Sequence, residues 1–208
     1  MAAPSASLRF LHLAPGDPPL DVYVGDALVL PSLRYLQLSD YRELPPARHR
    51  IHCYPAGTGG WENVVLDIEL EKLRPRFDYT LALLNRIPDL QPLLLEDTAP
   101  PPGREQARVR FLHASPDAPA LDIRTGGGRL LFTLVPFARV TPFAEIAAGT
   151  YELEVRRSSH PTLLATLRQY VLAGEHFYTF VAHGLVDGEP PFGVMPLEMP
   201  VRRCVPVP

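Results

Sequence analysis

Apolar and polar residues alternate along much of the chain with a period of two. Leu8, Phe10 and His12 share one side of the first such segment. The same spacing recurs at 20–24, 66–71, 109–113 and 151–156. Alternation of this kind is typical of a β-strand that packs one face against a core and leaves the other face wet.

Further short strands are expected where apolar runs are bounded by proline, glycine or aspartate. They lie at 28–33, 48–54, 79–84, 130–134, 163–171 and 178–183. The 66–73 segment also fits helical spacing, but Pro75 and the alternation through Asp67 and Glu69 favour a strand. The chain holds 25 prolines in 208 residues, and proline interrupts helices and central strands alike. The pattern therefore predicts an all-β fold of short strands.

Two segments that lie 101 residues apart are nearly the same. Residues 9–21 read RFLHLAPGDPPLD and residues 110–122 read RFLHASPDAPALD, with eight identities in thirteen positions. Weaker matches join 41–47 to 143–149 and 78–82 to 177–181. We therefore expect two copies of one module of about seven strands, folded as tandem antiparallel β-sandwich domains.

A proline-rich segment separates the two copies. It reads DTAPPPGREQA at 97–107, which favours an extended polyproline conformation that does not pair into a sheet. The predicted organisation is a first sandwich at 1–96, a linker at 97–107, a second sandwich at 108–199 and an extended C-terminal tail at 200–208.

The segment VRFLHASPDAPALD at 109–122, followed by Phe137, AGTY at 148–151 and Tyr178-Thr179, resembles the bacterial DUF4397 domain family. The resemblance covers about 8–96 and 108–199, although the first copy has Leu-Ala in place of Ala-Ser after its histidine and a longer hairpin around 57–60. It implies a compact immunoglobulin-like or transthyretin-like β-sandwich, often duplicated, in proteins that are frequently exported or attached to the cell envelope. It implies no established activity.

Charge and hydropathy argue against several classes of function. The formal net charge is −3, and no run of Lys or Arg is interleaved with aromatic residues, so nucleic acid is not an expected partner. Apolar runs such as 81–84 and 93–95 are far shorter than the roughly 20 residues of a transmembrane helix. No secretory leader is recognisable before Leu8.

Histidine and aspartate recur at equivalent places in the two copies. His12 and His113 are each followed nine residues later by Asp21 and Asp122. Such a pair can bind a metal or act as acid and base, but two ligands per copy do not close a metal site. The density of turn-forming residues favours a structural loop motif, in which the histidine rings cap the turn and the aspartates accept backbone N–H groups.

Other chemical motifs are incomplete. Ser115 and Asp117 lie in the same loop, and Ser115 with His113 and Asp122 has the residue types of a nucleophilic triad. However, the first copy has Ala14 at the place of Ser115, and no GxSxG elbow is present. The glycine clusters at 57–60 and 126–128 lack the Lys-Ser/Thr of a phosphate loop. We expect no catalytic residue, no metal and no cofactor.

Three residues leave alternatives open. Trp61, with Glu62 after the glycine turn, either packs in the core, as a lone tryptophan usually does, or forms an exposed aromatic platform for a carbohydrate or a partner protein. Cys53 lies in a predicted strand and Cys204 in the tail. They are either two free thiols or, in an oxidising setting, a disulfide within one chain or between two.

Two functions from different classes fit these observations. The first is a non-enzymatic structural or adhesive protein of a bacterial surface layer, appendage or spore coat, which assembles with itself or with another surface protein through edge strands, the tail and Cys53/Cys204. The alternative is a soluble binding module that recognises a carbohydrate, peptide or small ligand through its end loops. A place at the cell surface is expected, with the cytoplasm as the alternative.

Overall fold

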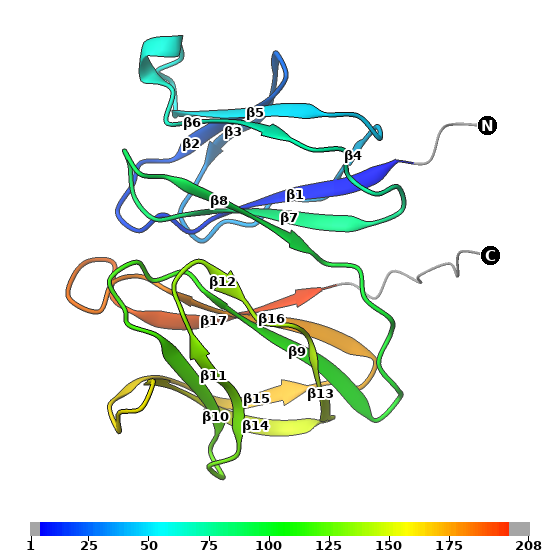
Figure 1. The fold of residues 1–208 in the computed structure, drawn as a ribbon, viewed down its shortest axis with the longest axis vertical. Coiled ribbons are helices and arrows are strands. Elements are labelled where there is room, and N and C mark those ends of the chain that lie inside the picture. Colours follow the sequence, from blue (N-terminus) through cyan, green and yellow to red (C-terminus); the bar gives the residue numbers. More distant parts are fainter. Residues whose placement is uncertain (1–4, 200–208) are drawn as a thin grey trace. The chain divides into compact units, whose positions relative to one another are not determined.

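Residues 5–199 are described by the computed structural model, and they form an all-β protein of two compact units (Figure 1). The first unit spans Met1–Thr98 and the second spans Ala99–Pro208. The first unit contains one short 3-10 helix, η1 (Trp61–Asn63). Its strands are β1 (Ala6–His12), β2 (Leu20–Val24), β3 (Ala27–Leu33), β4 (Arg42–Leu44), β5 (His49–Pro55), β6 (Leu66–Leu70), β7 (Asp78–Leu84) and β8 (Gln91–Glu96).

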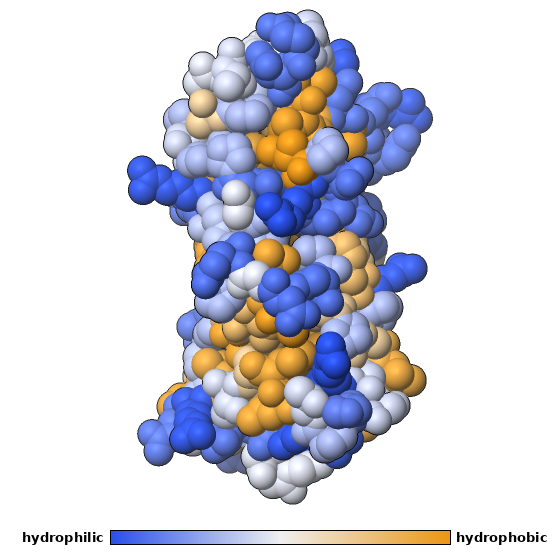
Figure 2. All heavy atoms as spheres, turned by 90° about the vertical axis from the view of Figure 1, so that its left-hand side faces the viewer, coloured by the Kyte–Doolittle hydropathy of each residue, from blue (hydrophilic) through white to orange (hydrophobic). Residues whose placement is uncertain are grey.

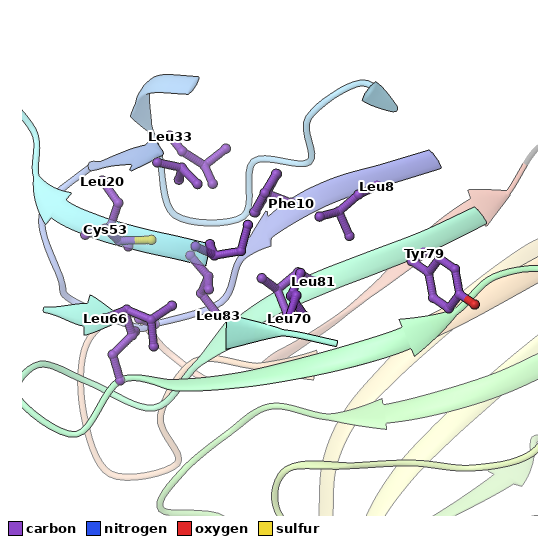
Figure 3. Packing of buried hydrophobic residues seen from close by; sticks show 14 of the residues in the cluster. Leu8, Phe10, Leu20, Leu33, Cys53, Leu66, Leu70, Tyr79, Leu81 and Leu83 are labelled. Carbon is purple, nitrogen blue, oxygen red and sulfur yellow. The ribbon is translucent and has the colours of Figure 1, made fainter. Parts of the chain in front are cut away.

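The first unit is a sandwich of two four-stranded sheets, with strand orders β4-β1-β7-β8 and β3-β2-β5-β6. Along the strands, the side chains that face inward fill the space between the two sheets. Figure 3 shows Leu8, Phe10 and Leu81 of the first sheet pointing toward Leu20 and Cys53 of the second. This burial of apolar side chains is the main source of stability of the unit.

The second unit repeats this arrangement. Its sheets have the orders β12-β9-β16-β17, in which β13 also pairs with β9, and β11-β10-β14-β15. The strands are β9 (Gln106–His113), β10 (Leu121–Thr125), β11 (Leu130–Val135), β12 (Arg139–Val140), β13 (Ala144–Ala147), β14 (Gly149–Arg157), β15 (Leu163–Leu172), β16 (His176–His183) and β17 (Gly193–Met199). The predicted fold class, two all-β sandwiches, is confirmed.

Strand pairing is antiparallel with one exception in each unit. β1 pairs with β7 in parallel, and β9 pairs with β16 in parallel. Local alternation does not specify which strand is a neighbour, so the sequence pattern gave no sign of these pairs. Among residues 5–199 there is no helix long and apolar enough to cross a bilayer.

Two details differ from the sequence-based expectations. β1 is buried along its whole length instead of on one side, and Arg9 is buried with it. The guanidinium of Arg9 donates to the Thr80 hydroxyl at 2.9 Å and lies 3.4 Å from the Asp97 carboxylate. Asp97 is thus held within the first unit and β9 begins at Gln106, while the linker bounds of 97–107 stay a prediction.

Candidate functional site

An aromatic cluster covers the outer face of the β2-β5-β6 sheet. In β2 and β5, Val22, Ile51 and Cys53 point into the core, so the alternate residues point outward. These outward residues include Tyr23, His52 and Tyr54, and Trp61 from the loop between β5 and β6 joins them. We call Tyr23, His52, Tyr54 and Trp61 the aromatic face.

The rings of the aromatic face contact one another closely. Tyr23 stacks on His52 with ring centroids 5.0 Å apart, and His52 lies 5.1 Å from Trp61. Tyr54 meets His52 edge-on at 5.4 Å. The imidazole at the centre is only 5% exposed, and its Nδ1 has no hydrogen-bond partner among residues 5–199.

Trp61 is held at the surface by a glycine-built loop. Gly57, Gly59 and Gly60 all have positive φ angles (78°, 56° and 79°), which other residues adopt only with strain. The Asn63 side chain donates to the Gly59 carbonyl at 2.7 Å, which closes the turn around Trp61. Trp61 is 55% exposed, so of the two alternatives for this residue the structure excludes packing in the core.

Charged groups border the aromatic face. Arg50 donates to both oxygens of Asp67, at 2.7 and 2.6 Å, and its guanidinium carbon lies 4.5 Å from the centre of the Trp61 ring. The hydrogen bonds from Arg50 lower the pKa of Asp67, which therefore stays ionised at neutral pH. A shallow hollow of about 540 Å³ adjoins this pair and is lined by Arg48, Arg50, Asp67, Ile68 and Glu69.

The two conspicuous histidines pin turns. His12 Nε2 lies 3.2 Å from the Pro18 carbonyl, and His113 Nε2 lies 3.0 Å from that of Pro119. In both rings Nδ1 accepts the N–H of the residue two positions further on, at 3.2 and 3.3 Å. Burial lowers the pKa of both rings, so each is neutral at pH 7 and Nε2 carries the proton.

Asp21 and Asp122 tie down neighbouring loops. Asp21 accepts the N–H groups of Ser32 at 2.8 Å and Gly57 at 2.9 Å, so it also anchors the loop that presents Trp61. Asp122 Oδ1 accepts the Ser158 hydroxyl at 2.6 Å and the Leu134 N–H at 2.9 Å. Burial works to raise the pKa of Asp122, but these hydrogen bonds lower it overall.

The residues of the supposed triad do not assemble into one. The Ser115 hydroxyl donates to Asp117 at 3.2 Å, and both ring nitrogens of His113 serve the turn. Asp117 also accepts the N–H groups of Val186 and Asp187, at 2.9 and 3.0 Å. Within residues 5–199, no group of three or more His, Cys, Asp or Glu side chains is placed to hold a metal ion.

A family model described as a domain of unknown function (DUF4397) matches residues 6–124, which is more than half of the chain. The chain belongs to the DUF4397 family. No curated protein matches it. Among solved structures, it is similar to CBMbc (family CBM26) from Eubacterium rectale Amy13K in complex with maltoheptaose, with 9% identity and a TM-score of 0.26. That alignment covers 94% of this chain and 97% of the other.

The second unit of this DUF4397 protein shows that its fold does not need the aromatic face. The strand register of the two units can be compared position by position. Tyr54, which lies opposite Asp21, corresponds to Arg156, which lies opposite Asp122. In the same way Tyr23 and His52, which lie opposite each other, correspond to Arg124 and Glu154. Three outward aromatic positions of the first unit are therefore charged in the second. The loop that carries Trp61 spans 56–65, whereas its counterpart spans only 158–162.

Cys53 of the DUF4397 chain is a free thiol in the core of the first unit. It is 0% exposed, and burial raises the pKa of its thiol to about 12. Cys204, with the tail at 200–208, lies outside the described residues. A disulfide from Cys53 to Cys204 would require the core to open, so the structure favours the free-thiol alternative for Cys53.

The aromatic face is the site that sequence reasoning found only in part. Trp61 was recognised as a candidate, but Tyr23, His52 and Tyr54 were not. A usable signal was present, because the same alternation that sends Val22 inward sends Tyr23 outward. The register that brings β2 against β5 is needed to see that these rings meet.

Proposed function

We propose that this protein is a non-catalytic binding module and that its ligand is a carbohydrate held on the aromatic face. The observation that carries the proposal is the exposed indole of Trp61, supported by a cluster of rings and bordered by the Arg50–Asp67 pair. A sugar ring has apolar C–H faces that pack on aromatic rings and hydroxyl groups that bind carboxylates and guanidinium groups. Ligand sites combine aromatic surface with a few fixed polar groups in this way.

Charge around the site favours a neutral ligand. Arg50 is paired with Asp67, and Arg48 lies 3.2 Å from Glu71 and 3.7 Å from Glu69. Both basic side chains of the hollow are thus engaged by carboxylates, which would repel a phosphate backbone. A neutral sugar carries no such penalty, and its hydroxyls can share the oxygens of Asp67 and Glu69.

The site is built in advance of binding. Trp61 is fixed by the closed loop, and the remaining rings lie on paired strands. Little conformational freedom is then lost when a ligand binds, which raises affinity for a given contact area. The second unit folds with charged residues at the same positions, so the fold alone does not require these rings.

The test is binding of a panel of neutral oligosaccharides to the full chain, measured by titration calorimetry. Trp61→Ala should weaken binding at least tenfold, which corresponds to about 1.4 kcal/mol. The matched control is Leu130→Ala, an exposed apolar residue in the second unit at 43% exposure, which should bind as the unaltered chain does. Equal affinity of the Trp61→Ala variant and the unaltered chain would contradict the proposal.

A second candidate function, self-assembly as a structural or adhesive surface protein, is favoured by apolar residues at sheet edges. β11 and β15 are the outer strands of their sheet, and Leu134 and Val171 on them are 61% and 62% exposed. Figure 2 shows apolar residues reaching the surface of each unit between polar ones. Sedimentation tests this candidate: concentration-dependent oligomers that Val171→Lys disperses would support it, and a monomer at all concentrations would refute it.

A further inference from the structure

The outer face of the second unit contains a hollow of its own, at the place where the first unit has the aromatic face. It has a volume of about 410 Å³ and lies over β10, β14 and the loop that follows β14. Its lining residues are Asp122, Arg124, Gly128, Glu154, Arg156, Ser159, His160 and Pro161.

Most of the charged groups in this hollow are already engaged. Arg156 donates through Nε to Glu154 at 2.8 Å and through a terminal nitrogen to the Pro161 carbonyl at 2.6 Å. Asp122 uses Oδ1 to accept three donors from neighbouring residues. Each of these acids therefore uses one carboxylate oxygen to hold the loops or the neighbouring arginine.

Arg124 is different because its donors are not matched. Its Nε is shielded from solvent and has no acceptor among residues 5–199. Its terminal nitrogen lies 3.8 Å from Asp122 Oδ2, which is longer than a hydrogen bond. The side chain is 40% exposed, so a small movement can bring its planar fork onto an acceptor from solution without breaking a hydrogen bond of the protein.

His160 adds a second donor to the lining. Its Nδ1 accepts the Thr162 N–H at 3.2 Å, so the proton of the neutral ring is on Nε2. This nitrogen is the one left to donate to a bound group. Arg124 and His160 together supply donors, and one carboxylate oxygen each of Asp122 and Glu154 is already engaged by donors of the protein.

We propose that the hollow over β10 and β14 binds a small oxyanion group, a carboxylate or a sulfate, through Arg124 with His160 beside it. Two oxygens of a carboxylate or of a sulfate can accept two parallel hydrogen bonds from a guanidinium, which is the strongest arrangement open to Arg124. At the equivalent place of the first unit the bordering guanidinium, that of Arg50, is already bound to both oxygens of Asp67, so the two units bind different chemistry. This proposal does not depend on the carbohydrate proposal, because it concerns different residues in the other unit.

The test is a titration of the full chain, labelled with ¹⁵N, with sodium acetate and, separately, with sodium sulfate at constant ionic strength. NMR follows the Arg124 side-chain Nε–H and the backbone amides of Gly128 and Ser159. We expect a saturable shift at these three sites with a dissociation constant in the millimolar range. Saturation by acetate alone identifies a carboxylate site, and saturation by both ions identifies a general oxyanion site.

Variants separate a specific site from diffuse attraction. Arg124→Gln should weaken the response of the Gly128 and Ser159 amides at least tenfold, and Arg124→Lys, which keeps the charge but loses the fork, should be intermediate. Arg168→Gln removes an exposed arginine outside the hollow and should leave the response unchanged. Non-saturable shifts, or an unchanged response in Arg124→Gln with the spectrum of a folded protein, would overturn the proposal.

Discussion

Replacement of Cys53 tests the core of the first unit most sharply. Cys53 lies on the inner side of β5, opposite Val22 of β2 and Leu66 of β6. In the second unit the same register position, opposite Ile123, is occupied by Val155. The fold therefore already accepts valine at this place, and Cys53→Val should change the free energy of unfolding by less than about 1.5 kcal/mol.

Cys53→Ser should be far more damaging. It places a hydroxyl in an apolar environment, and a buried hydroxyl without a partner costs about 1–3 kcal/mol. Taking roughly 2 kcal/mol, and about 4–8 °C per kcal/mol for a domain of this size, the midpoint of thermal unfolding of the first unit should fall by about 8–16 °C.

The assay can resolve the first unit from the second. Trp61 is the sole tryptophan of the chain, so its emission reports the unfolding of the first unit in urea or on heating. Far-ultraviolet circular dichroism reports both units. Two results would show that Cys53 is not a free thiol in an apolar core. One is a Cys53→Ser variant as stable as the unaltered chain, and the other is a loss of stability of the unaltered chain on adding a thiol reductant, which would indicate a disulfide.

Further substitutions probe the buried polar groups. Arg9→Met leaves the Asp97 carboxylate buried with the hydroxyl groups of Tyr41 and Thr80 as donors, and it should lower the free energy of unfolding by about 3 kcal/mol, measured by Trp61 emission. An unchanged urea midpoint would contradict this. The pKa of Asp122 is lowered in the folded state, so its contribution to the free energy of unfolding is present above about pH 4 and is lost as the pH falls. Asp122→Asn should therefore make stability, measured by circular dichroism, fall less steeply at acid pH. An equally steep fall in the variant and the unaltered chain would argue against this. Burial lowers the pKa of His12 and His113, so the stability that depends on their neutral rings is fully present above about pH 6.5 and is lost as the pH falls through their lowered pKa. A double His→Gln variant should lose this pH dependence in thermal melts, and its persistence would point to other groups.

Strand positions followed from the sequence because each depends on a local rule. The alternation around Leu8, Leu66 and Tyr151 placed β1, β6 and β14, and the bounding glycines and prolines set the limits of the strands. The partner of each strand did not follow, since the parallel pairs join segments about 70 residues apart. Neither alternation nor turn residues carry that information.

The same limit applies to the candidate site. Trp61 stood out because tryptophan is rare and follows a glycine turn, whereas Tyr23 and His52 are common residues in different strands. Only the register between β2 and β5 stacks them. The unmatched donor of Arg124 could likewise not be predicted from the sequence, because it depends on which donors the Asp122 carboxylate accepts.

The aromatic face as a ligand surface is tested most directly by the emission of Trp61 during titration with a neutral oligosaccharide. We expect a saturable shift of the emission to shorter wavelength, together with protection of the indole from acrylamide quenching, because the sugar excludes water from the ring. Binding of the sugar with unaltered Trp61 emission and quenching would contradict it.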